Sequence, residues 1–274
     1  MRNYGTGWTV VSPIKRNNVR IAGSARTAIM FAHGFGCDQN MWRYVVPAFE
    51  DRFRSVLFDH VGAGQSDLSA YDSQKYSTLE GYADDVVQIG NELGLKGAIF
   101  VGHSVSGMIG LLASLKAPEM FKSLVMVGPS PRYIDDEDYV GGFKEKQIAE
   151  LLEFLGNNYM GWSTTMAPVI MGNADRPELG EELTNSFCRT DPDIAKEFAR
   201  VTFSSDNRSD LPKAVIPTLI LQCSEDVIAP LAVGEYMHSQ MPNSELIILK
   251  ATGHCPNLSA PDEVISAIRS FVRA

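Results

Sequence analysis

Short apolar runs recur along the chain, each bounded by residues that favour turns. Runs of this length are typical of strands buried in a sheet. They cover residues 28–32, 55–58, 98–101, 124–127, 218–221 and 246–249. Between several of them, apolar residues recur at the spacing of one helix face, over residues 78–93, 106–115 and 262–272. This alternation predicts an α/β fold with a mostly parallel sheet flanked by helices, and a ligand site outside the carboxyl ends of the strands.

The alternation of strands and helices stops between about residues 131 and 211. Helical patterns follow one another there without an intervening strand, and Met, Trp, Tyr and Phe are frequent. Helix-breaking sequences with glycine and proline mark both ends of this segment. We therefore expect residues 1–130 and 212–274 to form the core, and residues 131–211 to form a helical cap, or lid, inserted over the sheet.

Acidic residues outnumber basic ones by 33 to 24 in the 274-residue chain, which gives a formal net charge of -9. Because phosphate groups attract basic surfaces, we expect neither a nucleic acid nor an acidic membrane surface as a partner. Residues 97–115 carry no charged side chain and are about long enough to cross a bilayer. Since this stretch has His103, Ser104 and several glycines in its middle, we expect a buried strand, a tight turn and a buried helix instead.

The four cysteines are widely spaced, without the close pairing of a zinc or redox site. They are also too few for the disulfide framework of a secreted scaffold. The first 25 residues show no signal-peptide pattern. We therefore expect a cytoplasmic protein that needs neither a metal nor a cofactor.

A candidate nucleophile, Ser104, lies in the sequence GHSVSG at residues 102–107, between a strand pattern and a helical one. This is the context of a nucleophile elbow, a sharp turn that lifts a serine hydroxyl out of the sheet. The strict elbow pattern is G-x-S-x-G, and Ser106 replaces its last glycine. A buried turn of small residues is the alternative interpretation.

A serine nucleophile needs a base to remove its proton and a carboxylate to orient that base. In elbow-type hydrolases the chain order is Ser, acid, His. Asp226 follows the fifth strand pattern, and His254 follows the sixth. The neighbouring Glu225 is the alternative acid, but the apolar pair and the proline that follow favour Asp226. The alternative role for His254 is that of a loop histidine capping a helix.

Hydrolysis of an ester also needs backbone N–H groups aimed at the developing oxyanion. The sequence HGFG at residues 33–36 follows the first apolar run, where this class of hydrolase provides one such donor. The second donor comes from the residue after the nucleophile. These positions assign the backbone N–H groups of Phe35 and Val105 to an oxyanion hole. A phosphate-binding loop is disfavoured because the glycine pattern is incomplete.

Four motifs resemble one branch of the α/β hydrolases. They are HGFGCDQ at residues 33–39, GHSVS at 102–106, SPRY at 130–133 and YVGGF at 139–143. Together they are similar to the RsbQ-type bacterial stress-response regulators and to the related plant karrikin and strigolactone receptors. The resemblance implies the α/β-hydrolase fold with a V-shaped helical cap over an apolar pocket. By position in matching motifs, the implied pocket residues are Phe35, Tyr133, Phe143, Trp162, Met166 and Phe203.

The residues and the resemblance together predict a serine hydrolase, carboxylesterase-like, that acts on a small apolar ester or lactone under the lid. Carbon–carbon bond hydrolases and cofactor-free haloperoxidases use the same three residue types and stay open. The resemblance further implies slow turnover, a signalling role of the RsbQ type and a sensor-linked phosphatase as partner. The alternatives are a metabolic carboxylesterase and a ligand receptor that works mainly through a protein partner.

Overall fold

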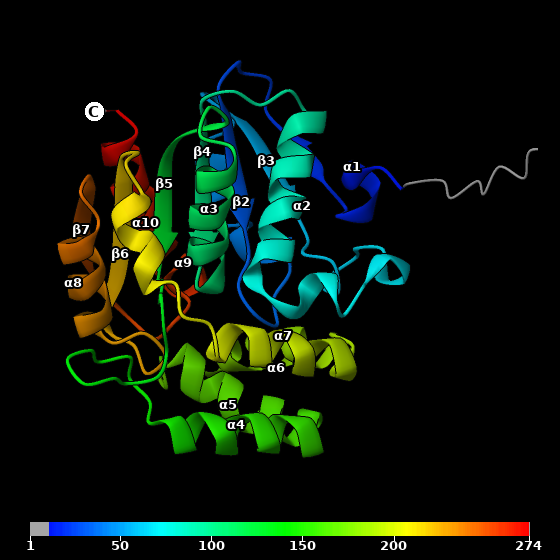
Figure 1. Ribbon diagram of the computed structural model, residues 1–274, viewed down its shortest axis with the longest axis vertical. Helices are drawn as coiled ribbons and strands as arrows, with labels where there is room; N and C mark the ends of the chain where they lie inside the picture. Colours follow the sequence, from blue (N-terminus) through cyan, green and yellow to red (C-terminus); the bar gives the residue numbers. More distant parts are fainter. Residues whose placement is uncertain (1–10, 274) are drawn as a thin grey trace, which may run out of the picture.

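A seven-stranded sheet forms the centre of the protein in the computed structural model, which describes residues 11–273 (Figure 1). The strand order is β1-β3-β2-β4-β5-β6-β7, in which β1 is antiparallel to β3 and the other neighbours are parallel. The strands are β1 (Arg20–Ala22), β2 (Ala28–Ala32), β3 (Arg54–Phe58), β4 (Ala98–His103), β5 (Phe121–Val127), β6 (Thr218–Glu225) and β7 (Ser244–Thr252). The predicted α/β fold, with its mostly parallel sheet and flanking helices, is thus confirmed.

Successive residues of a strand point to opposite faces of the sheet, and two hydrophobic cores result. On β2, Ile29 and Phe31 belong to one core, whereas Met30 and Ala32 belong to the other. The first core is covered by α10 (Pro261–Phe271) and the second by α2 (Leu79–Glu92), α3 (Val105–Lys116) and α8 (Leu231–Gln240). The sheet is therefore buried on both faces, which explains why its central strands read as continuous apolar runs.

Short helices complete the core. They are α1 (Pro13–Arg16), α9 (Pro256–Ser259) and the 3-10 turns Gln39–Trp42, Val46–Ala48, Leu68–Ala70, Lys75–Ser77 and Arg208–Lys213.

Four helices separate β5 from β6 in the sequence and gather at one end of the sheet (Figure 1). They are α4 (Glu145–Asn157), α5 (Tyr159–Met171), α6 (Pro177–Cys188) and α7 (Pro192–Phe203). Local signals define their ends. The Asn158 side chain accepts a hydrogen bond from the Gly161 N–H at the start of α5, and Asp191 caps α7 just before a proline. Gly172, with a positive φ of 61°, ends α5.

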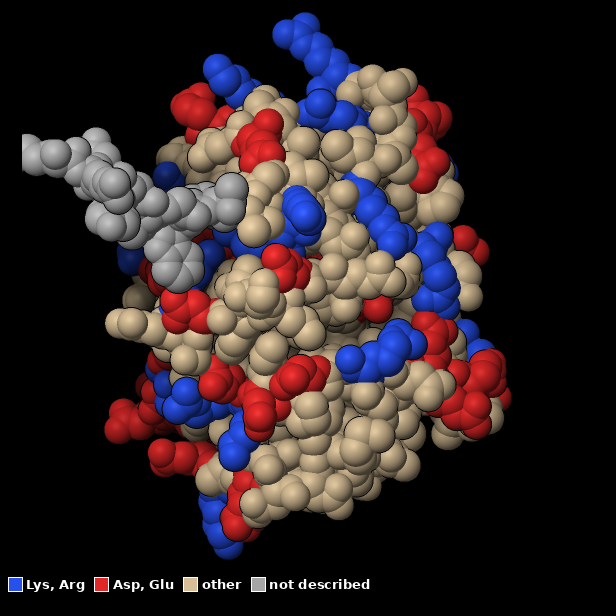
Figure 2. Space-filling view, turned by 90° about the vertical axis from the view of Figure 1, so that its right-hand side faces the viewer, with Lys and Arg blue, Asp and Glu red and all other residues tan. Residues whose placement is uncertain are grey.

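Charges of both signs are interspersed on the face shown in Figure 2, where no continuous basic patch appears. In the part of the chain that the structure describes, no helix has the length and apolar character needed to span a membrane.

Candidate active site

Ser104 occupies the turn between β4 and α3, at the end of the sheet where α4–α7 gather (Figure 1). Its backbone angles, φ 56° and ψ -125°, are unusual for a residue with a side chain. The turn is tight enough that a Cβ on Gly102 would lie 2.3 Å from the carbonyl oxygen of Ser106. The sequence therefore folds here as a strained elbow that presents the Ser104 hydroxyl.

Ser106, which departs from the elbow pattern, is fully buried in a hydrogen-bond network. Its hydroxyl donates to the carbonyl of His33 at 2.5 Å and accepts from Nε2 of His60 at 2.8 Å. The backbone N–H of His60 in turn donates to Nε2 of His33 at 3.0 Å. Burial and the neighbouring His33 lower the pKa of His60 well below its usual value, so His60 is neutral. The extra hydroxyl thus ties the elbow to the loop that begins at His33.

His254 connects Ser104 to Asp226. Nε2 of His254 lies 2.8 Å from the Ser104 Oγ, and Nδ1 lies 2.7 Å from Oδ2 of Asp226. Because an ionised carboxylate only accepts hydrogen bonds, Nδ1 carries the proton and Nε2 is free to accept from the serine hydroxyl. The other carboxylate oxygen of Asp226 accepts the N–H groups of Ile228 and Ala229, at 2.8 and 3.1 Å. These hydrogen bonds orient the Asp226 carboxylate toward the His254 imidazole.

Glu225, the alternative acid, is the last residue of β6 and is exposed. Its backbone carbonyl accepts a hydrogen bond from the Gly253 N–H at 2.7 Å, which positions the loop that carries His254. Asp226, which follows the strand, turns inward and is 8% exposed. The structure therefore brings Asp226, rather than Glu225, to the histidine.

The loop at residues 33–36 lies directly against the nucleophile. A Cβ on Gly34 would be 3.2 Å from the Cβ of Ser104 and 2.6 Å from Nδ1 of His103, so only glycine fits there without a shift. Among the described residues, the N–H groups of Phe35 and Val105 have no hydrogen-bond acceptor. That of Val105 is an unpaired donor of the first turn of α3. Phe35 also belongs to the wall of the cavity beside Ser104, and Val105 directly follows Ser104 in the chain.

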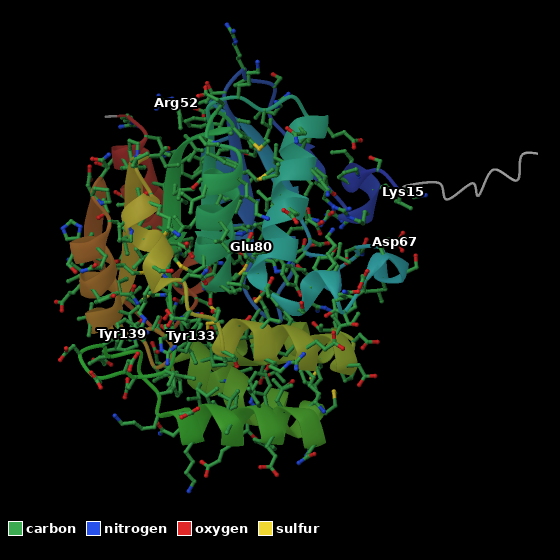
Figure 3. All side chains as sticks on the ribbon, in the orientation of Figure 1. Lys15, Arg52, Asp67, Glu80, Tyr133 and Tyr139 are labelled. Atoms are coloured by element: carbon green, nitrogen blue, oxygen red, sulfur yellow. The ribbon has the colours of Figure 1, made fainter. Side chains whose placement is uncertain are left out.

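A cavity of about 30 Å³ adjoins Ser104 and His254 beneath the cap. Of the six residues expected to line a pocket, Phe35, Tyr133 and Phe203 do so. Tyr133 lies where the core meets the cap (Figure 3). The wall is completed by Cys37, His103, Ile170, Leu183, Phe187, Thr202, Ile228 and Cys255. It is largely apolar, as expected for a site that takes up a hydrophobic ligand.

The other three expected pocket residues lie outside the cavity wall in this conformation. Trp162 is behind it, stacked on Phe187 with ring centroids 5.4 Å apart. Phe143 is partly buried and its N–H donates to the carbonyl of Tyr133 at 3.1 Å, so it supports the segment that carries Tyr133. Met166 is partly buried on α5 and packs against the core.

Several wall residues were missed by sequence reasoning. Cys37 lies within the motif at residues 33–39 and Cys255 directly follows His254, but the pocket prediction included neither of them. Burial raises the pKa of the Cys37 thiol to about 12 and that of Cys255 well above its usual value, so both thiols are neutral. Thr202 directly precedes Phe203, which the sequence placed in the pocket. This neighbour was the one available sign that Thr202 also lines the cavity.

Two further groups set the electrostatics of the wall. Burial and the nearby His254 lower the pKa of His103 to about 3, so His103 is neutral and its Nε2–H donates to the carbonyl of His254 at 2.7 Å. Burial raises the pKa of Tyr133, which keeps its hydroxyl protonated. Among residues 11–273, no group of three or more His, Cys, Asp or Glu side chains is arranged to hold a metal ion.

A serine, a histidine and an aspartate joined by hydrogen bonds, on loops at one end of a mostly parallel sheet, define the class of α/β hydrolases. The comparison with protein families agrees. Residues 27–261 match the family described as alpha/beta hydrolase fold, and the chain belongs to that family. It is a serine hydrolase of the carboxylesterase-like kind.

Proteins similar over nearly the whole chain include receptors and enzymes. The chain is 39% identical over 253 residues to the Karrikin insensitive 2 receptor CA of Petunia hybrida, covering 92% of this chain and 94% of the relative. It is likewise 39% identical, with the same coverage, to a strigolactone esterase of Arabidopsis thaliana. A solved structure of a hydrolase from Oleispira antarctica has a TM-score of 0.93 and 42% identity, covering 95% of this chain and 96% of that one.

Proposed function

We propose that the protein is a slow serine esterase or lactonase that acts on a small, mostly apolar ester or lactone. Ser104, His254 and Asp226 are its catalytic residues. The observation that carries this proposal is the pair of hydrogen bonds through His254, at 2.8 Å to Ser104 and 2.7 Å to Asp226. In this geometry the imidazole can take the serine proton while the carboxylate stabilises the resulting positive charge.

The proposed reaction has two steps. The Ser104 Oγ attacks the carbonyl carbon of the substrate while His254 accepts the hydroxyl proton, and the N–H groups of Phe35 and Val105 bind the oxyanion. His254 then returns the proton to the leaving alcohol, which leaves an ester on Ser104. A water molecule, deprotonated by His254, attacks this ester and releases the acid together with the free serine.

The helices of residues 131–211, which include α4–α7, act in this proposal as the cap that encloses the substrate. The cavity of about 30 Å³ has room for only about two water molecules, each of which needs about 10–15 Å³. We therefore infer that the cap or the aromatic wall moves when an ester binds beside Ser104. Such a step would limit turnover.

We further propose a signalling role of the RsbQ type, in which ligand capture or hydrolysis changes the contacts of the cap with a sensor-linked phosphatase. The support is the similarity to a protein named as a receptor, over 92% of the chain, and the small cavity beside Ser104. A metabolic carboxylesterase is the alternative, supported by the similarity to a named esterase. A sensor-linked phosphatase encoded in the neighbouring reading frame and copurifying with this protein would support signalling, whereas fast turnover of a metabolite without any such complex would support metabolism.

Hydrolysis of p-nitrophenyl acetate and butyrate tests the catalytic proposal. We expect wild-type protein to release p-nitrophenol and Ser104→Ala to lose this activity. The exposed Ser239→Ala serves as the matched control and should behave like wild type. Full activity of Ser104→Ala would overturn the assignment of the nucleophile. A burst followed by slow turnover would support the slow mechanism, and sustained fast turnover would contradict it.

A further inference from the structure

Thr202, near the end of α7, is a residue of the cavity wall, and its buried hydroxyl has no hydrogen-bond partner. The residue is 1% exposed, so this hydroxyl has lost its contact with bulk water as well. A buried hydroxyl without a partner destabilises a protein, and valine would fill the same space without that cost. The hydroxyl is therefore a feature that the stability of the cap does not explain.

Other hydroxyl-bearing residues in the cap helices behave differently. Ser163, Thr164, Thr165 and Thr184 each donate to the backbone carbonyl four residues earlier, at 2.8–2.9 Å. Threonine in a helix has two accessible side-chain rotamers, and one of them makes this bond. Thr202 does not make it, although it also lies in a helix. Its hydroxyl is thus left free in a residue that forms the cavity wall.

A second wall residue, Tyr133, has a buried hydroxyl that lies beside Ser104. The ring of Phe203, the neighbour of Thr202, packs edge-on against the Tyr133 ring with centroids 5.1 Å apart. Phe203 thus links Thr202 to Tyr133 in a largely apolar wall, and of these two residues it is Thr202 whose hydroxyl lies away from Ser104 in the cap helix α7. The Ser104 hydroxyl, in contrast, is already hydrogen-bonded to His254.

We propose that Thr202 is a specificity-determining residue whose hydroxyl binds a second oxygen atom of the substrate, remote from the scissile carbonyl. This inference rests on the proposed esterase function and narrows its substrate class to esters or lactones with an additional ether or keto oxygen. The scissile carbonyl oxygen is bound by the loop and elbow N–H groups of the core, whereas Thr202 belongs to the cap helix α7. The two contacts would therefore hold the substrate at separate points.

Paired substrates with and without the additional oxygen test this inference. p-Nitrophenyl methoxyacetate and butyrate differ by one oxygen in place of a methylene group, and the 4-oxopentanoate and pentanoate esters place a keto oxygen farther along the acyl chain. The measured quantity is the ratio of kcat/KM for the oxygenated ester to that for its hydrocarbon partner. For at least one pair we expect Thr202→Val to lower this ratio about five- to tenfold relative to wild type. Thr202→Ser should retain most of it.

Thr184→Val is the matched control because Thr184 is also a threonine of the cap helices, although it is only partly buried and its hydroxyl donates to the carbonyl of Gly180. Its ratios should equal those of wild type. The role of Thr202 would be overturned if Thr202→Val left the kcat/KM ratios of both substrate pairs unchanged while activity still depended on Ser104. The proposed function would then still stand. Activity independent of Ser104 would instead overturn the proposed function itself.

Thermal unfolding adds a readout that does not depend on any substrate. Because Thr202→Val removes an unpaired buried hydroxyl, we expect the variant to unfold about 2–4 °C above wild type. Thr184→Val, which loses a hydrogen bond, should show no such gain. A lower unfolding temperature for Thr202→Val would mean that the hydroxyl has a structural partner, and it would contradict the inference.

Discussion

The backbone N–H of His254 donates a hydrogen bond to the carbonyl of Ile170, in the last turn of cap helix α5, at 2.9 Å. The carbonyls of a last helical turn have no partner within the helix, so the loop with the candidate base satisfies one of them. Asn173 adds a second link, since its side-chain amide donates to the carbonyls of Met171 and Thr252, each at 2.9 Å. The position of α5 and the position of the His254 imidazole are therefore coupled.

Gly253→Ala tests this coupling. Gly253 has a φ of 80°, and a Cβ at this position would lie 1.8 Å from the carbonyl oxygen of Met171. The loop or α5 must move to accept it, which displaces His254. We expect kcat with p-nitrophenyl acetate to fall at least about tenfold, because small misplacements of catalytic groups are costly.

Gly94→Ala is the control for the backbone strain in this test. Gly94 also has a positive φ, of 61°, but nothing lies within 4 Å of the added Cβ. This variant should lose some stability and keep its kcat. Equal losses of kcat in the two variants would show that strain, rather than contact with the cap, causes the effect.

Asp226→Asn should remove most of the activity without unfolding the protein. The amide can no longer hold Nδ1 of His254 as the proton donor, so the imidazole loses the orientation and tautomer that the mechanism requires. We expect kcat to fall about 10³–10⁴-fold. Glu225→Gln is the matched control and should stay near wild type, because the Glu225 side chain is exposed. A larger loss in Glu225→Gln than in Asp226→Asn would reverse the assignment of the acid.

Ser106→Gly would create the strict elbow pattern, yet we expect it to destabilise the protein. The substitution removes the hydroxyl that donates to the His33 carbonyl and accepts from Nε2 of His60. Both buried partners would be left without their bond, at a cost of about 1–3 kcal/mol in the free energy of unfolding. Urea denaturation measures this change. An unchanged or higher stability would show that the network contributes little.

Stability should decrease steeply in mildly acidic solution because His103 is buried as a neutral group. Its pKa in the folded protein is about 3, below the unfolded value near 6.5. Between these values the unfolded chain binds more protons than the folded protein, so the free energy of unfolding falls as the pH falls from about 6.5 toward 3. His60, whose pKa burial also lowers, acts in the same direction.

His103→Gln should make this dependence shallower when urea midpoints are compared at pH 7.5 and 5. Glutamine does not titrate, so the contribution of His103 to proton uptake on unfolding is removed. His238→Gln, at an exposed histidine, is the control and should keep more of the wild-type slope. A wild-type slope in His103→Gln would contradict the assigned role of burial.

The sequence predicted those parts of the fold that depend on local pattern. Residues 28–32 are all buried in β2, so the strand reads as one apolar run whatever its neighbours are. β1 was missed because its three residues are partly or fully exposed and owe their extended form to pairing with β3. The α8 helix was also not expected, since it buries only a narrow face that includes Val233 and Met237.

The candidate site was predictable where the topology of the sheet determines it. Ser104, Asp226 and His254 each follow a strand, and the carboxyl ends of parallel strands lie at one edge of the sheet. The orientation of the Thr202 hydroxyl depends instead on a side-chain rotamer and on packing between cap helices. Such contacts join residues far apart in the chain and leave no local pattern.

The central claim, that Ser104 is a nucleophile activated by His254, is tested most directly by covalent labelling. An organophosphate such as diethyl p-nitrophenyl phosphate reacts with an activated serine, and the mass of the intact protein reports the adduct. We expect one diethylphosphoryl group on wild-type protein, located at Ser104 by peptide mapping, none on Ser104→Ala and much slower labelling of His254→Ala. Labelling at another residue, or equal labelling of all three proteins, would contradict the account.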